Sequence, residues 1–299
     1  MNLRTQGLLP PASVDAYLIR PRGGNTGDRL IADACERFLR DRGIEVWLSD
    51  GSFEEAAIAG DSAYLIAALS PFRGMLMFPG GGNIGIYPDN EAIRAGILAY
   101  ATARQRCLVF SQSAVRAEPC LIDNRVTVWC RDAVSLAILE NAGTRVELVP
   151  DMALYMDDLI AKKPGGEGVY FISRGPGRDR ERVSHGIAMD CPTADLTFDA
   201  PLEQVIATLD PYEIVLTDRL HGGLIALMMR KKVVFLPIGY HKMHGFIDTW
   251  FSSCAAVAYV DKRADLSSRI AALEAPDCDL RQMFCRFADP AFGRFLMRQ

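Results

Sequence analysis

"EIVLTDRLHGGLIALMMRKKVVFLPI" (residues 213–238) contains the repeating unit that decides the fold. The apolar run at 213–218 predicts a buried strand, 220–230 predicts a helix, and 232–238 predicts a second buried strand. A strand, a helix and a strand in succession are typical of parallel sheets with right-handed crossover connections. The stretch therefore indicates an α/β protein.

The same alternation runs along the whole chain. It predicts two doubly wound, Rossmann-like α/β domains that face a cleft, with the first at 1–160 and the second at 161–280. The glycine-rich stretch "KKPGGEG" (162–168) is the best candidate for the linker between them. Among the expected helices are 29–42, 53–69, 90–104, 133–142, 201–209, 246–253 and 263–274.

Composition limits the possible partners. With 299 residues and a formal charge of −4, the chain lacks the broad basic surface that nucleic acid requires. Its eight cysteines show no CxxC spacing, and neither a signal peptide nor an apolar run of about 18 residues is visible, which predicts a cytoplasmic protein. The amphipathic, cationic tail (281–299) is expected to pack back on the first domain. Peripheral contact with the inner face of the membrane is the alternative.

Two glycine-rich turns follow predicted strands in the first domain. "GGNTGD" (23–28) and "PGGGN" (79–83) both allow close approach of backbone N–H groups to an anion or a hydroxyl. Neither contains the dinucleotide fingerprint or the P-loop lysine. Asp28 is expected either to cap the following helix or to bind a hydroxyl, and "PGGGN" is otherwise a plain loop.

Arginines stand at the carboxyl ends of two other predicted strands. Arg131 follows the strand in "WCRD", where Asp132 is a natural N-cap for the next helix, and Arg174 ends "FISR". Ligands of open α/β sheets bind outside the carboxyl ends of the strands. Both arginines are therefore candidate anion ligands, with ion pairs to neighbouring carboxylates as the alternative.

Two side chains that can carry positive charge lie close together in "TDRLHG" (217–222). If Asp218 caps the helix, Arg219 and His221 fall in its first turn, where the helix dipole is positive. That placement is locally unfavourable unless an anion binds there. The alternative is an Arg219–Asp218 ion pair and a histidine bonded to a backbone carbonyl.

Lys242 is a further candidate, expected in the loop after strand 232–238. His241 and His244 flank it at i, i+3 spacing, but a zinc site needs a third ligand, and the HExxH pattern is missing. No metal and no cofactor are expected.

Together these motifs identify a resemblance. "GGNTGD", "FPGGGN", "CRD", "SR", "TDRLHG" and "GYHKMHGF", in this order between about residues 17 and 253, resemble the polysaccharide pyruvyltransferases, which include ketal-pyruvate transferases of bacterial exopolysaccharide synthesis. The resemblance implies a glycosyltransferase-B-like fold. It also implies transfer of the pyruvyl group of phosphoenolpyruvate to two hydroxyls of a hexose in a polysaccharide or its lipid-linked precursor, with release of phosphate.

The resemblance also implies roles for the candidate residues. Arg219 and His221 are the expected catalytic pair, with His221 as general acid or phosphate partner. The expected phosphoenolpyruvate ligands are Arg131, Arg174, Arg219, His221 and Lys242, and the expected acceptor ligands are Asn25, Asp28, Gly81, Gly82 and Asn83.

Two other functions fit the predicted fold. A nucleotide-sugar-dependent glycosyltransferase needs an acidic ribose ligand in the second domain, and Glu203 is its only proposed candidate. A non-catalytic saccharide-binding protein is the other. It would not need cationic side chains that cost free energy to bury, and this chain retains four candidates, Arg131, Arg219, His221 and Lys242.

Overall fold

The computed structural model describes residues 9–20, 24–49, 51–173, 191–195 and 200–297. These form two compact units, and neither is continuous in sequence. Unit 1 comprises the described parts of Met1–Gly23, Ile31–Met152 and Phe287–Gln299. Unit 2 comprises Gly24–Leu30 and the described parts of Ala153–Arg286. The long helices α1 (Thr26–Arg40) and α12 (Leu280–Met297) contribute residues to both units.

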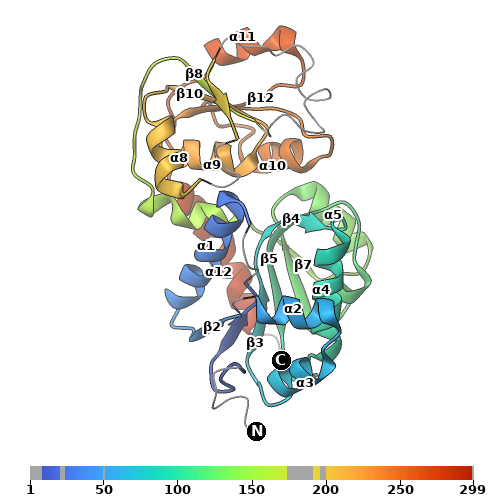
Figure 1. Ribbon diagram of the computed structural model, residues 1–299. Coiled ribbons are helices and arrows are strands. Elements are labelled where there is room, and N and C mark those ends of the chain that lie inside the picture. Colours follow the sequence, from blue (N-terminus) through green and yellow to red (C-terminus); the bar gives the residue numbers. More distant parts are fainter. Residues whose placement is uncertain (1–8, 21–23, 50, 174–190, 196–199, 298–299) are drawn as a thin grey trace. The chain divides into compact units, whose positions relative to one another are not determined.

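Unit 1 is built on a parallel sheet in the order β2-β1-β3-β5-β6-β7, with β4 pairing β5 (Figure 1). Its strands are β1 (Ala16–Leu18), β2 (Val46–Leu48), β3 (Met75–Phe78), β4 (Gly81–Ile84), β5 (Cys107–Ala114), β6 (Val126–Cys130) and β7 (Val146–Leu148). Its remaining helices are α2 (Ser52–Ala59), α3 (Ser62–Leu69), α4 (Pro88–Tyr100) and α5 (Ala133–Asn141), with 3-10 turns at η1 (Pro119–Leu121) and η2 (Met152–Leu159).

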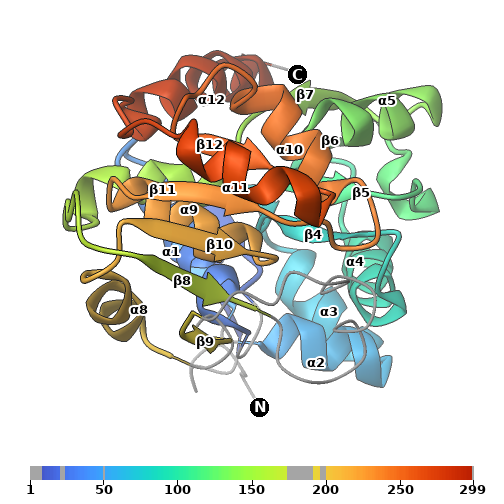
Figure 2. The same cartoon turned by 90° about the horizontal axis from the view of Figure 1, so that it is seen from above.

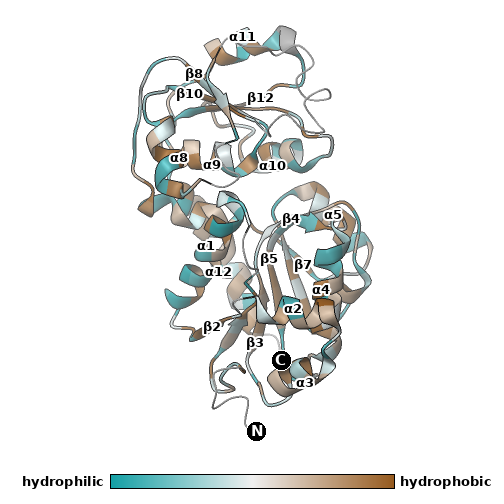
Figure 3. Cartoon of the chain, in the orientation of Figure 1, coloured by the Kyte–Doolittle hydropathy of each residue, from teal (hydrophilic) through white to brown (hydrophobic). Residues whose placement is uncertain are grey.

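Buried side chains cover both faces of this sheet. On one face Tyr17 stacks on Phe72 with ring centroids 3.6 Å apart, inside a core that α2, α3 and α4 complete. On the other face Phe38 of α1 packs edge-to-face on Phe110 and Trp129. Figure 3 shows hydrophobic residues along β3 and β5. Burial on both sides is why these strands read as continuous apolar runs.

Unit 2 contains a parallel sheet in the order β12-β11-β10-β8-β9 (Figure 2). Its elements are β8 (Val169–Ile172), β9 (Thr193–Ala194), α8 (Leu202–Leu209), β10 (Ile214–Thr217), α9 (Leu220–Met228), β11 (Lys232–Phe235), α10 (Lys242–Trp250), β12 (Val257–Tyr259) and α11 (Arg263–Ala271). In Figure 1, α8, α9 and α10 lie along one face of this sheet and α11 lies along the other. The predicted α/β class with parallel, Rossmann-like sheets is confirmed.

Four local predictions are wrong in detail. The expected helix 53–69 is two helices, because Gly60 adopts a left-handed φ of 67° and Asp61 caps α3. The turn at 79–83 continues into β4, which pairs with β5. Helix α1 begins at Thr26, three residues before the expected start, and α10 begins at Lys242, four residues early.

The stretch 162–168 is held against unit 2. Lys231 is buried, and its ammonium donates to the carbonyl oxygens of Gly165 and Asp210, each at 2.8 Å. The backbone N–H of Lys163 donates to Met229 O at 2.8 Å. These bonds satisfy a buried charge and fix a segment whose composition alone suggests a flexible connection.

None of the helices in the described part of the chain combines the length and the hydropathy that a membrane span requires.

Candidate active site

The arginine–histidine motif lies at the point where the strand order of unit 2 reverses. Strand β8 comes first in sequence, β9 pairs with one of its edges and β10 with the other. Arg219 and His221 directly follow β10 at its carboxyl end, where α9 begins. Such a reversal opens a crevice at the carboxyl ends of the strands, and this is the usual ligand position in doubly wound sheets.

Arg219 occupies the N-cap position of α9 with an extended backbone (φ −108°). The prediction that Asp218 caps this helix is therefore wrong. Thr217 Oγ1 accepts from the backbone N–H of Arg219 at 2.9 Å. Asp218 is buried, and its Oδ2 accepts from Ser173 Oγ at 3.3 Å, which links the ends of β10 and β8.

The guanidinium of Arg219 is held by Asp195, which directly follows β9. Nε donates to Asp195 Oδ1 at 3.2 Å and Nη2 donates to Oδ2, which makes a two-pronged ion pair. Both side chains are mostly buried. The Asp218 partner of the alternative reading is thus replaced by a carboxylate from β9, on the far side of β8 from β10, and this ion pair orients the guanidinium at the carboxyl ends of the strands.

His221 lies in the first turn of α9 and is 8% exposed. The backbone of Gly27 approaches its ring so closely that a Cβ at position 27 would lie 2.1 Å from Nδ1 and 2.6 Å from the histidine Cβ. Gly27 is itself in the first turn of α1, so the positive ends of two helix dipoles converge beside one imidazole.

The glycines after His221 let α9 lie close on the sheet. A Cβ at Gly223 would lie 2.2 Å from the ring of Phe235 in β11, and one at Gly222 would lie 3.0 Å from Ile172 in β8. All residues of Leu220–Met228 are buried. The helix start that carries His221 is therefore fixed by tight packing.

Lys242 is the first residue of α10 and is half-buried, so its expected placement in a loop is wrong. The change follows from the helix starting four residues earlier than its apolar pattern suggests. His244 is exposed, with Nε2 3.0 Å from Asp248 Oδ2 one turn later. No group of three or more metal-ligating side chains occurs among the residues that the structure describes.

Arg131 lies in unit 1 and is fully buried. Its Nη1 donates to Asp151 Oδ2 at 2.7 Å and its Nε donates to Ser113 Oγ at 2.8 Å. Asp132 caps α5 by accepting from the backbone N–H of Ser135 at 2.8 Å, as the sequence predicts. The ion-pair alternative for Arg131 is thus present, with Asp151 as partner.

Asn25 and Asp28 form a reciprocal cap at the start of α1. Asn25 Oδ1 accepts from the backbone N–H of Asp28 at 3.1 Å, while Asp28 Oδ2 accepts from Asn25 Nδ2 at 2.7 Å. Asp28 Oδ2 also accepts from the backbone N–H of Asn25 at 3.3 Å, which completes the capping-box pattern with Asn25 at the cap, so Asp28 supports the helix from its first turn. Both residues lie in unit 2 with Gly27 and His221.

The residues Gly81–Asn83 lie in unit 1, within β4. Asn83 Oδ1 accepts from Arg94 Nη1 at 2.8 Å, and Arg94 in turn forms a buried ion pair with Glu118. Gly81 has a φ of 150°, which favours glycine. The expected ligand Arg174 lies outside the described residues.

Two features of the site were missed at the sequence level. Asp195 stands in "PTADLTFDA", a polar segment with no periodic pattern that could mark one carboxylate as the partner of Arg219. The contact between Gly27 and His221 joins positions far apart in the chain. Only the glycine in "GGNTGD" hinted at a close approach there.

The comparisons with known proteins agree with these motifs. The family model for polysaccharide pyruvyl transferases matches residues 25–240. A crystal structure of a functionally uncharacterised protein from Klebsiella pneumoniae subsp. pneumoniae is similar in fold, with a TM-score of 0.60 and 19% sequence identity, covering 84% of this chain and 94% of that one. No curated protein matches the chain. The family match spans Gly27, Asp195, Arg219 and His221, and the chain belongs to the polysaccharide pyruvyl transferase family.

Proposed function

We propose that this protein transfers the pyruvyl group of phosphoenolpyruvate to two hydroxyls of one hexose, forming a cyclic pyruvate ketal and releasing phosphate. The observation that carries the proposal is the pairing of Arg219, which an ion pair holds in place, with the buried His221. Both residues lie where the strand order of the unit 2 sheet reverses, in a chain that belongs to the pyruvyl transferase family. The hexose belongs to a polysaccharide or to its lipid-linked precursor, and transfer takes place on the cytoplasmic side of the membrane.

The donor is a small dianionic or trianionic molecule, which suits this site. A carboxylate and a phosphate on one frame match the fork of an arginine and the N–H groups of a helix start. Arg219 binds one oxyanion while Asp195 fixes the plane of its guanidinium. Arg174 and Lys242 supply further positive charge, whereas Arg131, already paired with Asp151, supports the carboxyl end of β6 from within.

The reaction needs a proton on the methylene carbon of the donor. We assign this transfer to His221, since a histidine can hold and release a proton near neutral pH. The first sugar hydroxyl then attacks the carbon that bears the phosphate. Phosphate leaves as the second hydroxyl attacks the same carbon. One hydroxyl proton restores the imidazolium and the other leaves with phosphate, so the charge and atoms balance.

Acceptor hydroxyls are proposed to bind at Asn25 and Asp28 and along Gly81–Asn83. Asn25 and Asp28 stand one residue or two from Gly27, which contacts His221, so a sugar held there is close to the proposed proton donor. The fold is proposed to be glycosyltransferase-B-like, and peripheral membrane contact of residues 281–299 would bring the protein to a lipid-linked acceptor.

The test is phosphate release from phosphoenolpyruvate in the presence of an acceptor library, with mass analysis of the products. The product should gain the mass of pyruvic acid less one water, and phosphate release should stop when acceptor is omitted. The Arg219→Ala/His221→Ala double variant should lose turnover, and retained turnover would overturn the assigned site.

A binding test separates this donor from a nucleotide sugar. Phosphoenolpyruvate at about 100 times its dissociation constant should stabilise the protein by about 2.7 kcal/mol. A panel of nucleotide sugars should give no comparable thermal shift. The reverse outcome would favour a nucleotide-sugar-dependent glycosyltransferase.

A further inference from the structure

Arg29 lies near the start of α1, directly after the proposed acceptor ligand Asp28. A positive side chain is unfavourable there, because the N-terminal end of a helix carries partial positive charge. The guanidinium nevertheless folds back to the helix start, where Nη1 donates to Gly24 O at 2.8 Å and Nη2 donates to Thr26 Oγ1 at 3.1 Å. Nη2 also donates to Ala200 O at 3.0 Å. One side chain thus bonds to three oxygen atoms in two distant segments of the chain.

The carbonyl of Ala200 is the point where these two segments meet. It accepts from the Arg29 guanidinium and also from Thr26 Oγ1, so two side chains of α1 share one acceptor. Ala200 stands shortly before α8 and five residues after Asp195, the partner of Arg219. The start of α1 is therefore bonded, at Ala200, to the stretch of chain between β9 and α8.

Asp195 is held independently of Arg29. The N–H of Phe171 donates to Pro192 O at 2.9 Å, and the N–H of Ser173 donates to Ala194 O at 3.2 Å, so β9 is bonded to β8 on both sides of its two residues. The ion pair with Arg219 then orients the carboxylate that follows β9. The donor side of the proposed site is thus assembled without any contact from Arg29.

The turn that carries the proposed acceptor ligands is closed by Arg29. Gly24 has a φ of 97°, a conformation that favours glycine, and its carbonyl accepts from the Arg29 guanidinium. The backbone N–H of Arg29 donates to Asn25 O at 3.0 Å. Between these points, Asn25 and Asp28 are bonded to each other. Bonds from Arg29 therefore fix both ends of the turn on which Asn25 and Asp28 stand.

We propose that Arg29 is a positioning residue for the transferase reaction. It holds the acceptor ligands Asn25 and Asp28 at a fixed place relative to the donor-binding residues of α9, and it contacts neither substrate. The inference rests on the proposed function, because it needs an acceptor bound at this turn. A displacement of about 1 Å between reacting groups can lower turnover about 100-fold, so a tether of this kind has a kinetic effect that exceeds its effect on stability.

The first experiment measures phosphate release by Arg29→Ala, with the soluble hexoside that turns over fastest in the acceptor library. The KM for the hexoside should rise about tenfold, the order expected for losing hydrogen bonds from a charged donor. The KM for phosphoenolpyruvate should change less than about twofold, because Arg219 keeps its partner.

The KM values separate positioning from a loss of folded protein. A smaller folded fraction lowers kcat and leaves both KM values unchanged, and that result would overturn the proposal. A rise in the KM for phosphoenolpyruvate alone would also overturn it, since Arg29 would then act on the donor.

Arg29→Lys tests whether charge or geometry is responsible. The lysine keeps the positive charge, but one ammonium group cannot reproduce the fork that reaches three oxygen atoms. It should therefore restore only part of the affinity for the hexoside. Full restoration would show that charge alone is required and would overturn the tether.

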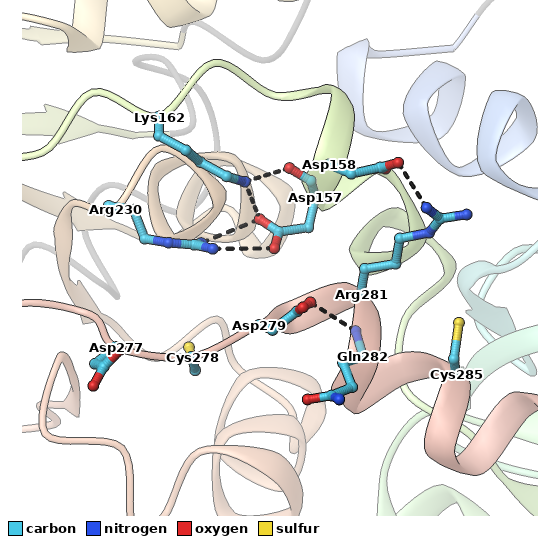
Figure 4. Close-up of a pocket in the computed structure, with 10 residues that line it drawn as sticks. All are labelled: Asp157, Asp158, Lys162, Arg230, Asp277, Cys278, Asp279, Arg281, Gln282 and Cys285. Atoms are coloured by element: carbon cyan, nitrogen blue, oxygen red, sulfur yellow. Dashed lines mark hydrogen bonds and ion pairs between the residues drawn. The ribbon is translucent and has the colours of Figure 1, made fainter.

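Arg281→Ala is the matched control. Arg281 is also a half-buried arginine near the start of a long helix of unit 2, and it donates to Asp158 Oδ2 at 2.7 Å and to Tyr155 OH at 3.1 Å. It lines a pocket of about 730 Å³ whose described lining includes none of the proposed ligands (Figure 4). Both KM values should stay unchanged in this variant. An equal rise in the KM for the hexoside would reveal a general effect of removing such an arginine and would overturn the proposal.

The second experiment needs no substrate. Hydrogen exchange followed by mass spectrometry should show the amides of residues 25–30 exchanging about tenfold faster in Arg29→Ala, with peptides from β8 unchanged. Unchanged exchange at the start of α1 would overturn the tether. If the unaltered protein releases no phosphate with any hexoside, the proposed function fails and the positioning role fails with it, while exchange still reports whether the tether exists. The two failures are thus distinguishable.

Discussion

Replacing Gly27 by alanine should damage the site without touching any charged group. The new Cβ would lie 2.1 Å from Nδ1, 2.4 Å from Cγ and 2.6 Å from Cβ of His221. Ring rotation cannot relieve the last contact, because the histidine Cβ is fixed to the backbone of α9. Carbon atoms prefer separations of about 3.5–4.0 Å, so the two helix starts must separate by roughly 1 Å.

Two magnitudes follow from that displacement. Overpacking of this kind costs about 1–3 kcal/mol, and each kcal/mol lowers the melting temperature by about 2–4 °C in a unit of this size. A misplacement of about 1 Å can lower turnover about 100-fold. Differential scanning fluorimetry and acceptor-dependent phosphate release measure the two effects separately.

Gly293→Ala is the matched control. Gly293 lies inside α12, and a Cβ there would meet nothing within 4 Å. Alanine should therefore stabilise the protein by up to about 1 kcal/mol through helix propensity and leave turnover unchanged. If Gly27→Ala has the same melting temperature and the same rate of phosphate release as Gly293→Ala, the close approach of α1 to His221 is refuted.

Three further changes have defined outcomes. Asp151→Ala leaves the charge of Arg131 buried without its carboxylate inside unit 1, and should lower the free energy of unfolding by about 3–5 kcal/mol in chemical denaturation. A decrease below about 1 kcal/mol, which is typical of exposed pairs, contradicts the buried pair. Arg219→Lys keeps the charge but loses the fork, so the KM for phosphoenolpyruvate should rise about tenfold in the phosphate assay, and an unchanged KM argues against donor binding there. Hydrogen bonds from Arg125 lower the pKa of Asp123, so the ionised form stabilises the fold above about pH 4 and this contribution is lost at lower pH. The melting temperatures of Asp123→Asn and the unaltered protein should therefore converge as the pH falls through 4, and a constant gap would contradict this assignment.

The fold class was predictable because its signals are local. Each buried strand of a parallel sheet is a short apolar run, and the helices between them show a 3.6-residue period. Local signals fail where they are weak. Strand β9 has only two residues, and Gly60 divides a segment whose apolar content continues across it.

The position of the site could be predicted from the sequence, but the hydrogen-bond and ion-pair partners of its side chains could not. Strand ends mark where Arg219 and His221 stand, since any β–α unit places the next residues at the sheet edge. The choice between Asp218 and Asp195 as the partner of Arg219 depends on which strand lies beside β8. Neither spacing nor composition determines that order.

The membership of Gly24–Leu30 in unit 2 also constrains the order in which the chain can fold during synthesis. Thr26 Oγ1 donates to the carbonyl of Ala200, and Gly27 lies against His221, so these two contacts of the start of α1 form only after α9 has been synthesised. Unit 1 in turn requires the residues from Phe287 onward. Unit 1 therefore cannot be completed until all of unit 2 has been synthesised. A gene fragment that begins after residue 30 should yield a second unit in which the contact between Gly27 and His221 is missing.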